Sequence, residues 1–287
     1  MLGRKVFLKL ENLQTGGSFK ARGVLNLLSA FSGNLKDYRF ATVSGNFGIA
    51  VAEAAKALDI NVTVIMPENA PASSIEKIRH SGSAVILEDD VSSAFERARK
   101  LTEQGYHIID DCSDTLVAEG YGTLALELME DCPSLTDVFV ALGGGAMLAG
   151  IATVLKSRNP DIRIWGVETE GASSMYQALR AGKPVNVNIT SEISTLGVPE
   201  IDRRMLEHAQ RYIEKVITVS DRDAIQGMLS FGEQARLWVE PAAGTLIPAA
   251  FSVTSSMPND TVIGLIVCGG NITQREMNTW ANNRDLR

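Results

Sequence analysis

Short apolar runs, many of them β-branched, alternate with longer helical patterns along the whole chain, and this alternation restricts the fold more than any other feature. Most of the runs lack strict apolar–polar alternation, which is typical of strands buried on both faces of a parallel sheet. The sequence therefore predicts an α/β fold with right-handed crossovers. The expected strands are Val6–Leu10, Phe40–Val43, Val62–Met66, Ala84–Leu87, His107–Ile109, Asp137–Leu142, Ile162–Val167, Lys215–Val219 and Val262–Cys268. The expected helices are Phe19–Ala30, Phe47–Leu58, Ser73–Ser81, Ser92–Gln104, Glu119–Glu130, Met147–Ser157, Ser173–Arg180 and Asp221–Trp238.

The order of these elements suggests two structural units. Residues 40–114 contain four expected strands and three expected helices, enough for a small sheet of their own. Residues 1–39 and 115–287 would then form a larger sheet. We see no internal repeat and no low-complexity segment.

Composition excludes several classes of function. The formal net charge is −7, from 27 basic and 34 acidic residues, and no clustered Lys/Arg face argues for a nucleic-acid partner. No apolar run approaches the roughly 20 residues that a membrane span needs. The first residues lack the pattern of a signal peptide. We therefore expect a cytoplasmic protein with a small-molecule substrate.

Cysteine and histidine usage points the same way. Three widely spaced cysteines predict reduced thiols, as in a cytoplasmic protein: Cys112, Cys132 and Cys268. None of the three histidines has a Cys or His at metal-ligand spacing, so no zinc site is expected. A Gly-x-Ser-x-Gly turn is missing, which argues against a serine hydrolase of the α/β type.

A lysine lies in the unusual run Thr15-Gly16-Gly17-Ser18-Phe19-Lys20-Ala21-Arg22-Gly23. Lysine amines condense with carbonyl groups when their surroundings favour the neutral amine. The alternative is a solvated lysine near a helix N-terminus. The run alone leaves both interpretations open.

Three expected strands end in glycine and turn directly into a following segment, at residues 42–48, 141–150 and 267–273. Ligands of open parallel sheets bind where the carboxyl ends of strands meet helix N-termini. We therefore expect the three turns to share one crevice, between the two units.

The second of these turns, Gly143-Gly144-Gly145, is the best anion site, because consecutive glycines expose backbone N–H groups at a helix N-terminus. A phosphate is the expected ligand. A bare turn without ligand and a dinucleotide site are the alternatives. The P-loop pattern fails because Ile151-Ala152 stands where Lys-Ser/Thr belongs. The dinucleotide pattern fits in part: Leu148 replaces the third glycine, and Glu168 ends the next strand at a plausible ribose-binding position.

The other two turns carry polar candidates. Ser44 and Asn46 suit a carboxylate or a ring oxygen, although both residue types also cap helices. Cys268 ends an apolar strand, where a small buried hydrophobe and a polar role are equally plausible.

Together these segments resemble the fold-type II pyridoxal-phosphate enzymes, in the branch of serine/threonine dehydratases and serine racemases. The resemblance implies a tryptophan synthase beta-like fold, with two open parallel sheets and the cofactor in the cleft between them. It follows the family's order over nearly the whole chain, and rests on the segments Lys9–Lys20, Ser44-Gly45-Asn46, Gly143–Gly150, Gly166-Val167-Glu168, Glu240–Gly244 and Cys268-Gly269-Gly270-Asn271.

The resemblance also implies roles for individual residues. Lys20 would form the Schiff base with pyridoxal 5'-phosphate and later remove the Cα proton of the substrate. Phe19 would lie beside the cofactor ring, Asn46 would bind its hydroxyl, and Cys268 would face its pyridine nitrogen. Ser44 matches the opposite-face acid/base of serine racemases. The phosphate would be held by the backbone of Gly143, Gly144, Gly145, Ala146 and Met147. The substrate carboxylate would be received by Ser44, Gly45, Asn46 and Phe47.

The implied activity is an ammonia-lyase reaction: loss of water from L-serine, L-threonine or a 3-hydroxy relative, then release of a 2-oxo acid and ammonia. A homodimer is implied as well. An amino-acid racemase using Lys20 and Ser44 is the first alternative. A homologue that binds the cofactor without turnover is the second, and a nicotinamide dehydrogenase is the third.

The chain departs from the family in several places. A segment that the family usually carries before Val6 is missing, so we expect a truncated start. Phe47 replaces a common histidine, and Tyr121 stands where many relatives have glutamine. Ala146 replaces a fourth glycine, which is tolerable only if its φ is negative. Leu196 lies in the segment that binds a divalent cation in some relatives, beside Glu192, and cannot coordinate one, so no activating metal is expected.

Overall fold

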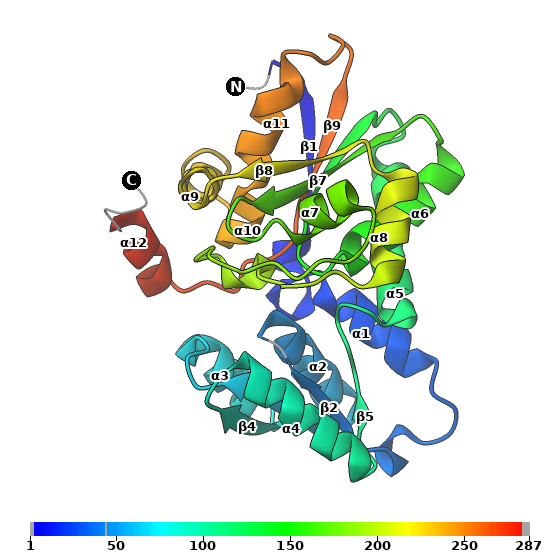
Figure 1. Ribbon diagram of the computed structural model, residues 1–287, viewed down its shortest axis with the longest axis vertical. Helices are drawn as coiled ribbons and strands as arrows, with labels where there is room; N and C mark the ends of the chain where they lie inside the picture. The colour runs from blue at the N-terminus through cyan, green and yellow to red at the C-terminus, as the bar shows by residue number, and fades with distance from the viewer. Residues whose placement is uncertain (1–2, 44, 283–287) are drawn as a thin grey trace.

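The structure is a computed structural model that describes residues 3–43 and 45–282. It contains two parallel sheets, one above the other in Figure 1. The upper sheet is built from both ends of the chain, and the lower one from a single continuous segment. The α/β fold with two open parallel sheets is therefore confirmed.

The larger sheet has five parallel strands in the order β1-β9-β6-β7-β8. The N-terminal strand pairs with the C-terminal one, with Lys5 opposite Val262 and Leu10 opposite Val267. The carboxyl ends of these two strands therefore lie side by side. The strands are β1 (Lys5–Leu10), β6 (Asp137–Ala141), β7 (Arg163–Thr169), β8 (Lys215–Val219) and β9 (Val262–Val267).

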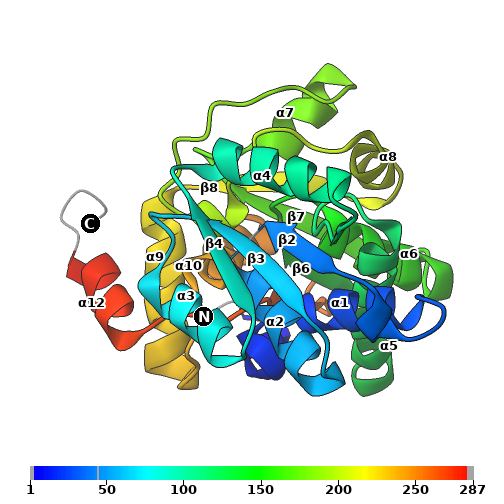
Figure 2. The same ribbon diagram turned by 90° about the horizontal axis from the view of Figure 1, so that it is seen from below.

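The smaller sheet has four parallel strands in the order β4-β3-β2-β5: β2 (Phe40–Val43), β3 (Val62–Pro67), β4 (Ala84–Glu88) and β5 (His107–Ile108). Its helices are α2 (Asn46–Leu58), α3 (Ala72–His80) and α4 (Val91–Glu103). Apolar side chains of α2 and α3 pack on one face of β3, and those of α4 pack on the other face. Figure 2 shows this sandwich from below, with α4 on one side of the sheet and α2 and α3 on the other. The four strands and three helices expected in residues 40–114 are confirmed.

Helices also join the two sheets and cover the larger one. Helix α1 (Lys20–Ser29) packs against both α2 and α5 (Thr115–Asp131), and α5 packs closely against α6 (Ala146–Arg158). The contact between α5 and α6 is so tight that a Cβ on Gly150 would lie 2.0 Å from the carbonyl oxygen of Ala118. The remaining helices are α1 (Lys20–Ser29), α5 (Thr115–Asp131), α6 (Ala146–Arg158), α7 (Ser174–Ala181), α8 (Arg203–Tyr212), α9 (Asp221–Ser230), α10 (Pro241–Gly244), α11 (Leu246–Thr254) and α12 (Gln274–Asn282).

One expected helix was wrong in its extent. The pattern predicted a continuous helix over Asp221–Trp238, but α9 ends at Ser230 and a single π-helical turn, Phe231–Ala235, follows. That turn stops at Arg236, which has a left-handed φ of 60°. The apolar pattern of the sequence does not reveal this helix end, because buried residues lie both before and after Arg236. The sequence analysis also missed α8, α10, α11 and α12.

A search of the described residues finds no helix long and apolar enough to cross a membrane. The same residues contain no group of three or more His, Cys, Asp or Glu side chains that could hold a metal ion.

Candidate active site

Lys20 is the first residue of α1, and its position is fixed from both ends of the chain. The amide of Phe19 donates a hydrogen bond to the carbonyl of Cys268 over 3.0 Å. Ser18 forms an isolated antiparallel bridge with Gly269. Phe19, Lys20 and Cys268, which the sequence analysis assigned to one site from distant segments, therefore lie together at the carboxyl end of β9.

Aromatic rings and one carboxylate surround the amine of Lys20. Its Nζ lies 4.5 Å from the centroid of the Phe19 ring. The rings of Phe47 and Tyr121 each lie 5.9 Å from the same atom. Nζ also donates a hydrogen bond to Asp111, and the two side chains are only 19% and 14% exposed. Lys20 is therefore no solvated surface lysine.

Asp111 is held on both of its oxygens. Oδ2 accepts from Lys20, and Oδ1 accepts from the hydroxyl of Tyr121 over 2.8 Å. The Tyr121 ring is fully buried and packs edge-to-face on Phe19 with centroids 4.7 Å apart. Burial, together with the charge of Asp111, raises the pKa of Tyr121 well above its usual value. The hydroxyl therefore keeps its proton at neutral pH and remains a donor.

A second polar cluster is centred on the buried carboxylate of Glu240. Asn46 Nδ2 lies 3.0 and 2.8 Å from its two oxygens, and the Asn271 amide donates to it over 2.8 Å. Asn271 Nδ2 in turn donates to Asn46 Oδ1 over 2.9 Å. Burial raises the pKa of Glu240, and the hydrogen bonds from Asn271 and Asn46 oppose that rise. Both ends of the Asn46 amide are thus engaged by protein groups, and its bond to a cofactor hydroxyl stays a prediction.

The glycine turn after β6 forms a narrow backbone cradle. Gly145 has φ of 93° and is the N-cap of α6, so no side chain caps that helix. A Cβ on Gly144 would lie 2.5 Å from Cys112 Sγ, and one on Gly145 would lie 3.1 Å from Met175 Cε. Only glycine fits these two positions. Exposed N–H groups at a helix N-terminus suit an anion.

Ala146, which replaces a fourth glycine, begins the helix with an ordinary negative φ. The substitution therefore introduces no backbone strain. Met147 follows it in the first turn of α6 and is buried.

Three further predicted residues, Cys268, Gly45 and Phe47, lie in the described part of the chain. Cys268 is buried, and this burial is the main reason why the pKa of its thiol is raised to about 12. The thiol is therefore neutral at pH 7. Gly45 is the N-cap of α2, and the ring of Phe47 is completely buried. Ser44 lies outside the described residues, so its predicted acid/base role has no structural description.

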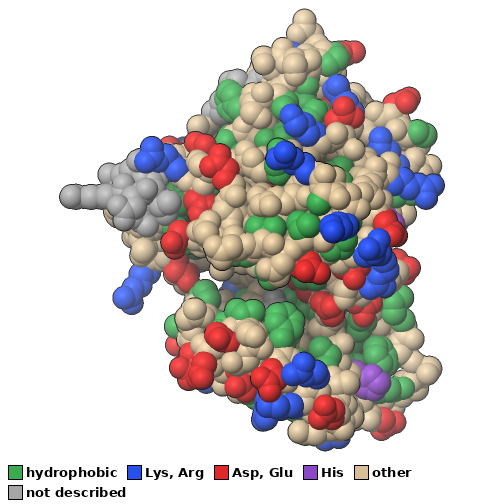
Figure 3. Space-filling view, in the orientation of Figure 1, with side chains coloured by type: hydrophobic (Ala, Val, Ile, Leu, Met, Phe, Trp, Pro, Cys, Tyr) green, Lys and Arg blue, Asp and Glu red, His purple; other side chains and the backbone are tan. Residues whose placement is uncertain are grey.

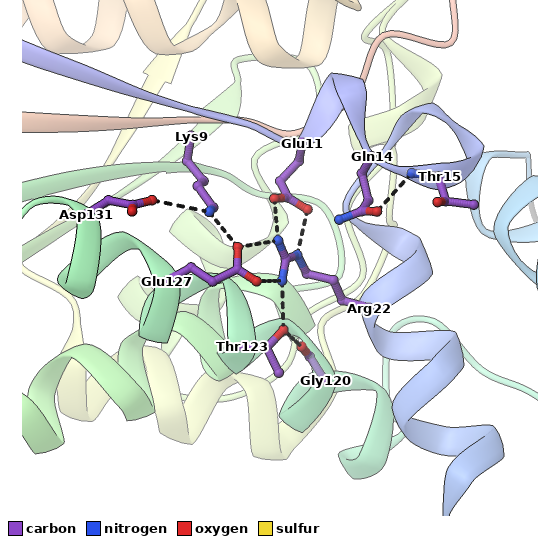
Figure 4. A network of polar contacts seen from close by, with 9 residues as sticks. All are labelled: Lys9, Glu11, Gln14, Thr15, Arg22, Gly120, Thr123, Glu127 and Asp131. Atoms are coloured by element: carbon purple, nitrogen blue, oxygen red, sulfur yellow. Dashed lines mark hydrogen bonds and ion pairs between the residues drawn. The ribbon is translucent and has the colours of Figure 1, made fainter.

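A charged network centred on Arg22 holds α1, the helix that begins at Lys20 (Figure 4). The guanidinium of Arg22 makes paired hydrogen bonds of 2.7 and 2.9 Å to Glu11 and of 2.7 Å each to Glu127. Lys9 donates to Glu127 over 2.6 Å. Burial opposes the charge of Arg22, but the bonds to both carboxylates raise its pKa. The network ties the turn after β1 and helix α5 to the helix that carries Lys20.

Two other predicted candidates have structural roles instead. The Glu168 carboxylate accepts from the amides of Met175 and Tyr176 over 2.8 and 2.9 Å, so it caps α7. It is therefore committed to a helix N-terminus, which argues against the dinucleotide interpretation. Leu196 is buried among apolar side chains. The backbone amide of Glu192 donates a hydrogen bond to Asp221 over 2.7 Å.

The space-filling view shows an indentation between the two sheet units on the face turned to the viewer (Figure 3). The described contacts around Lys20 come from both units: α2 supplies Phe47 and Asn46, while the glycine cradle and Cys268 come from the larger sheet. The profile of the family described as "Pyridoxal-phosphate dependent enzyme" matches residues 1–269 of this chain.

The chain belongs to this family.

Similar proteins of known description cover nearly all of the chain. It is 32% identical to the L-threonine ammonia-lyase of Thermotoga maritima over 94% of this chain and 68% of that protein. It is 33% identical to an L-threo-3-hydroxyaspartate ammonia-lyase of a Pseudomonas species, over 94% of this chain and 86% of that protein.

Solved structures agree in fold. The processed form of threonine deaminase isoform 2 from Solanum lycopersicum superposes with a TM-score of 0.92 at 27% identity, covering 100% of this chain and 80% of that one. Maize serine racemase superposes with a TM-score of 0.89 at 29% identity, covering 98% of this chain and 87% of that one.

The residues present fit pyridoxal phosphate, the group for which the family is named. Lys20 supplies the amine that an aldehyde needs, on a side chain only 19% exposed, and the cradle of Gly144 and Gly145 suits the phosphate. The hydroxyl of Ser18, two residues before Lys20, is buried without a hydrogen-bond partner among the described residues. An unpaired buried donor is costly unless a further group satisfies it.

Sequence reasoning missed three residues of this site: Asp111, Glu240 as a hydrogen-bond centre, and Asn271. Asp111 follows the end of β5, where the edge rule for parallel sheets would have placed it beside the other turns. The glutamate and the asparagine were noted only as parts of motifs. Which of their atoms point inward depends on packing, which a motif does not encode.

Proposed function

We propose that this protein is a pyridoxal-phosphate-dependent ammonia-lyase that acts on a β-hydroxy amino acid such as L-serine, L-threonine or a 3-hydroxy relative. The observation that carries this proposal is the setting of Lys20. Its amine lies among three aromatic rings and the Asp111 carboxylate, at the junction of the two sheets. The ammonia-lyases among its relatives support the same reaction class.

Each part of the site has a task in this reaction. When bound, the cofactor withdraws electrons from the amino acid and so acidifies its Cα–H bond. Lys20 is the attachment point for the cofactor aldehyde and, once released, the base that takes the Cα proton. The backbone of Gly143–Met147 holds the phosphate. The rings of Phe19 and Tyr121 exclude water from the Lys20 amine.

Cys268 is the group we place against the pyridine nitrogen. A thiol whose pKa is raised to about 12 by burial carries no charge at pH 7 and does not hold that nitrogen protonated as a carboxylate would. A neutral group at this position would make the bound cofactor a weaker electron sink, which would favour loss of the β-substituent over racemisation. Departure of the β-hydroxyl gives water, and the released unsaturated amine takes up water again to yield the 2-oxo acid and ammonia.

A serine racemase is the second candidate, because maize serine racemase is among the closely superposing structures. That reaction needs an acid on the face opposite Lys20, and Ser44 is the residue we assign to it. The substrate carboxylate would bind at Ser44, Gly45, Asn46 and Phe47 in either reaction.

We further propose a homodimer in the cytoplasm, with residues 40–114 moving as a small domain against residues 1–39 and 115–287. The division follows the two sheets. The three cysteines are free, as a reducing compartment requires. Leu25 on α1 and Leu126 on the adjoining α5 are exposed apolar side chains that a second copy could cover.

The function is tested by incubating the protein loaded with pyridoxal phosphate with L-serine, L-threonine and 3-hydroxy relatives. The 2-oxo acid and the ammonia that form are then measured. The proposal predicts equal amounts of the two products from at least one of these substrates. Inverted substrate without oxo acid would instead identify a racemase. Bound cofactor with neither product would identify a homologue that does not turn over.

A further inference from the structure

Asp111 is the one described carboxylate that contacts the Lys20 amine. Its two oxygens are shared between Lys20 and the hydroxyl of Tyr121. The carboxylate of its neighbour Asp110 is turned away, because it accepts from the Cys112 amide over 2.9 Å and from the hydroxyl of Ser113. Of these two adjacent acidic residues, only Asp111 therefore faces the Lys20 amine, while Asp110 binds its own loop.

Tyr121 prevents Asp111 from swinging out of the site. The tyrosine ring is completely buried and leaves no room at α1, where a Cβ on Gly23 would lie 2.6 Å from its Cε1. Its hydroxyl therefore keeps one carboxylate oxygen in place. The other oxygen continues to face the position of Lys20 Nζ.

Asp111 would accept fewer hydrogen bonds from Lys20 when that lysine holds the cofactor. A free lysine ammonium has three N–H donors, and most of them are lost when the nitrogen bonds to an aldehyde carbon. The negative charge of Asp111 is then only partly compensated at the place where the substrate nitrogen must arrive. We propose that Asp111, fixed by Tyr121, sets the charge selectivity of the site and makes it reject amino acids with an acidic side chain.

Chain length puts an upper limit on the distance involved. The substrate nitrogen would lie near the position of Lys20 Nζ, within hydrogen-bond distance of Asp111, about 3 Å. A side-chain carboxyl carbon on Cβ lies at most about 4 Å from that nitrogen, by ordinary bond lengths. The two carboxylates are thus no more than about 7 Å apart, which is within the Debye length of about 8 Å at physiological salt. The α-carboxylate is common to all substrates and cancels in the comparison.

This inference rests on the proposed function and narrows its substrate class to neutral β-hydroxy amino acids. It separates this chain from the relatives named for 3-hydroxyaspartate, to which it is similar in sequence.

The test compares kcat/KM for L-threonine and L-threo-3-hydroxyaspartate in the wild type, Asp111→Asn and the control Asp110→Asn. The wild type should prefer L-threonine. Asp111→Asn keeps the shape and removes the charge, so the relative efficiency on the acidic substrate should rise about tenfold. Asp110→Asn should leave the ratio within about twofold. An unchanged ratio in Asp111→Asn, or a wild type that prefers the acidic substrate, overturns the inference.

A binding measurement on the wild type keeps the inference testable even if the variant does not fold or no substrate turns over. L-Alanine and L-aspartate both lack a β-hydroxyl and differ in side-chain charge. Their Kd values are obtained from the change in visible absorbance of the loaded protein. We expect L-aspartate to bind at least about tenfold more weakly, and equal or tighter binding overturns the inference. Absence of oxo acid in the first experiment with weaker L-aspartate binding in the second would instead count against the proposed function alone.

Discussion

At the scale of single residues, the chain buries several carboxylates and satisfies each in a different way. Glu240 accepts hydrogen bonds from Asn46 and Asn271, while Asp137 accepts from Trp165 and Arg163. Glu168 has only backbone amides as partners. A buried carboxylate without a cationic partner is expected to favour its protonated form. The consequence is a dependence of stability on pH.

Glu168 gives the clearest prediction of this kind. Burial raises its pKa to about 7, so the folded protein binds the Glu168 proton more tightly than the unfolded chain does. The protonated Glu168 therefore adds to the free energy of unfolding, fully below the usual carboxyl pKa of about 4.5. This stabilisation is about 3 kcal/mol at most, and it is lost as pH rises through about 7. Urea unfolding at pH 5 and pH 8 should show a smaller pH difference in Glu168→Gln than in the wild type.

The exposed neighbour Glu170 provides the control for this experiment. Glu170→Gln should retain the full pH difference of the wild type. If Glu168→Gln showed that same difference, the buried carboxylate would not be its source.

At the scale of elements, the position of Lys20 depends on how α1 is held. The N-cap residue Phe19 is fixed by its hydrogen bond to Cys268 at the end of β9. Arg22, the third residue of α1, is fixed by its ion network with Glu11 and Glu127. Hydrogen bonds from Arg22 lower the pKa of Glu127 to about 2, so this network stays charged at neutral pH. The helix is thus oriented by charge on one side and by β-sheet contacts on the other.

Replacing Arg22 by methionine should destabilise the protein strongly. The change leaves the Glu11 side chain, only 3% exposed, without its cation, and a buried charge that loses its partner costs about 3 kcal/mol or more. The measurement is the free energy of unfolding in urea at pH 7. Adding Glu11→Gln to Arg22→Met should recover part of the loss.

Lys36→Met is the matched control, because the Lys36–Asp59 pair lies on the surface, with side chains 53% and 88% exposed. Surface pairs contribute about 0–1 kcal/mol. Equal losses in Arg22→Met and Lys36→Met would show that the network does not anchor α1.

Strand positions were predictable because their signal is local. Short apolar, β-branched runs gave Phe40–Val43 and Lys215–Val219 with correct bounds. The helix over Arg203–Tyr212 was missed although Asp202 caps it, because the strongly polar composition hid its apolar stripe. The short helix Pro241–Gly244 was missed for another reason: it depends on Gly244 packing against Gly227, where a Cβ would lie 2.0 Å from the Gly244 carbonyl oxygen. Such contacts between distant residues have no local pattern.

The site residues also fall into a group that was predictable from the sequence and a group that was not. Lys20, the glycine cradle and Cys268 belong to motifs and could be named from the sequence. Asp111 could not, because its importance comes from one oxygen facing Lys20 and another facing Tyr121. That arrangement exists only after α1 and α5 have packed together.

At the scale of the whole molecule, the site needs both sheets at once. The larger sheet supplies Cys268 and the glycine cradle, and the smaller unit supplies Asn46 and Phe47. Lys77 on α3 also reaches across, donating to Asn271 over 2.6 Å. Two lysines therefore lie within this region, and they differ in their surroundings. Only Lys20 is enclosed by aromatic rings.

The most direct measurement is borohydride reduction of the protein loaded with pyridoxal phosphate, followed by peptide mass mapping. The account predicts one added phosphopyridoxyl group, on the peptide that contains Lys20, and the label should persist in Lys77→Ala and disappear in Lys20→Ala. A label on Lys77 or another lysine, or an unlabelled Lys20 peptide from protein that holds the cofactor, would contradict it.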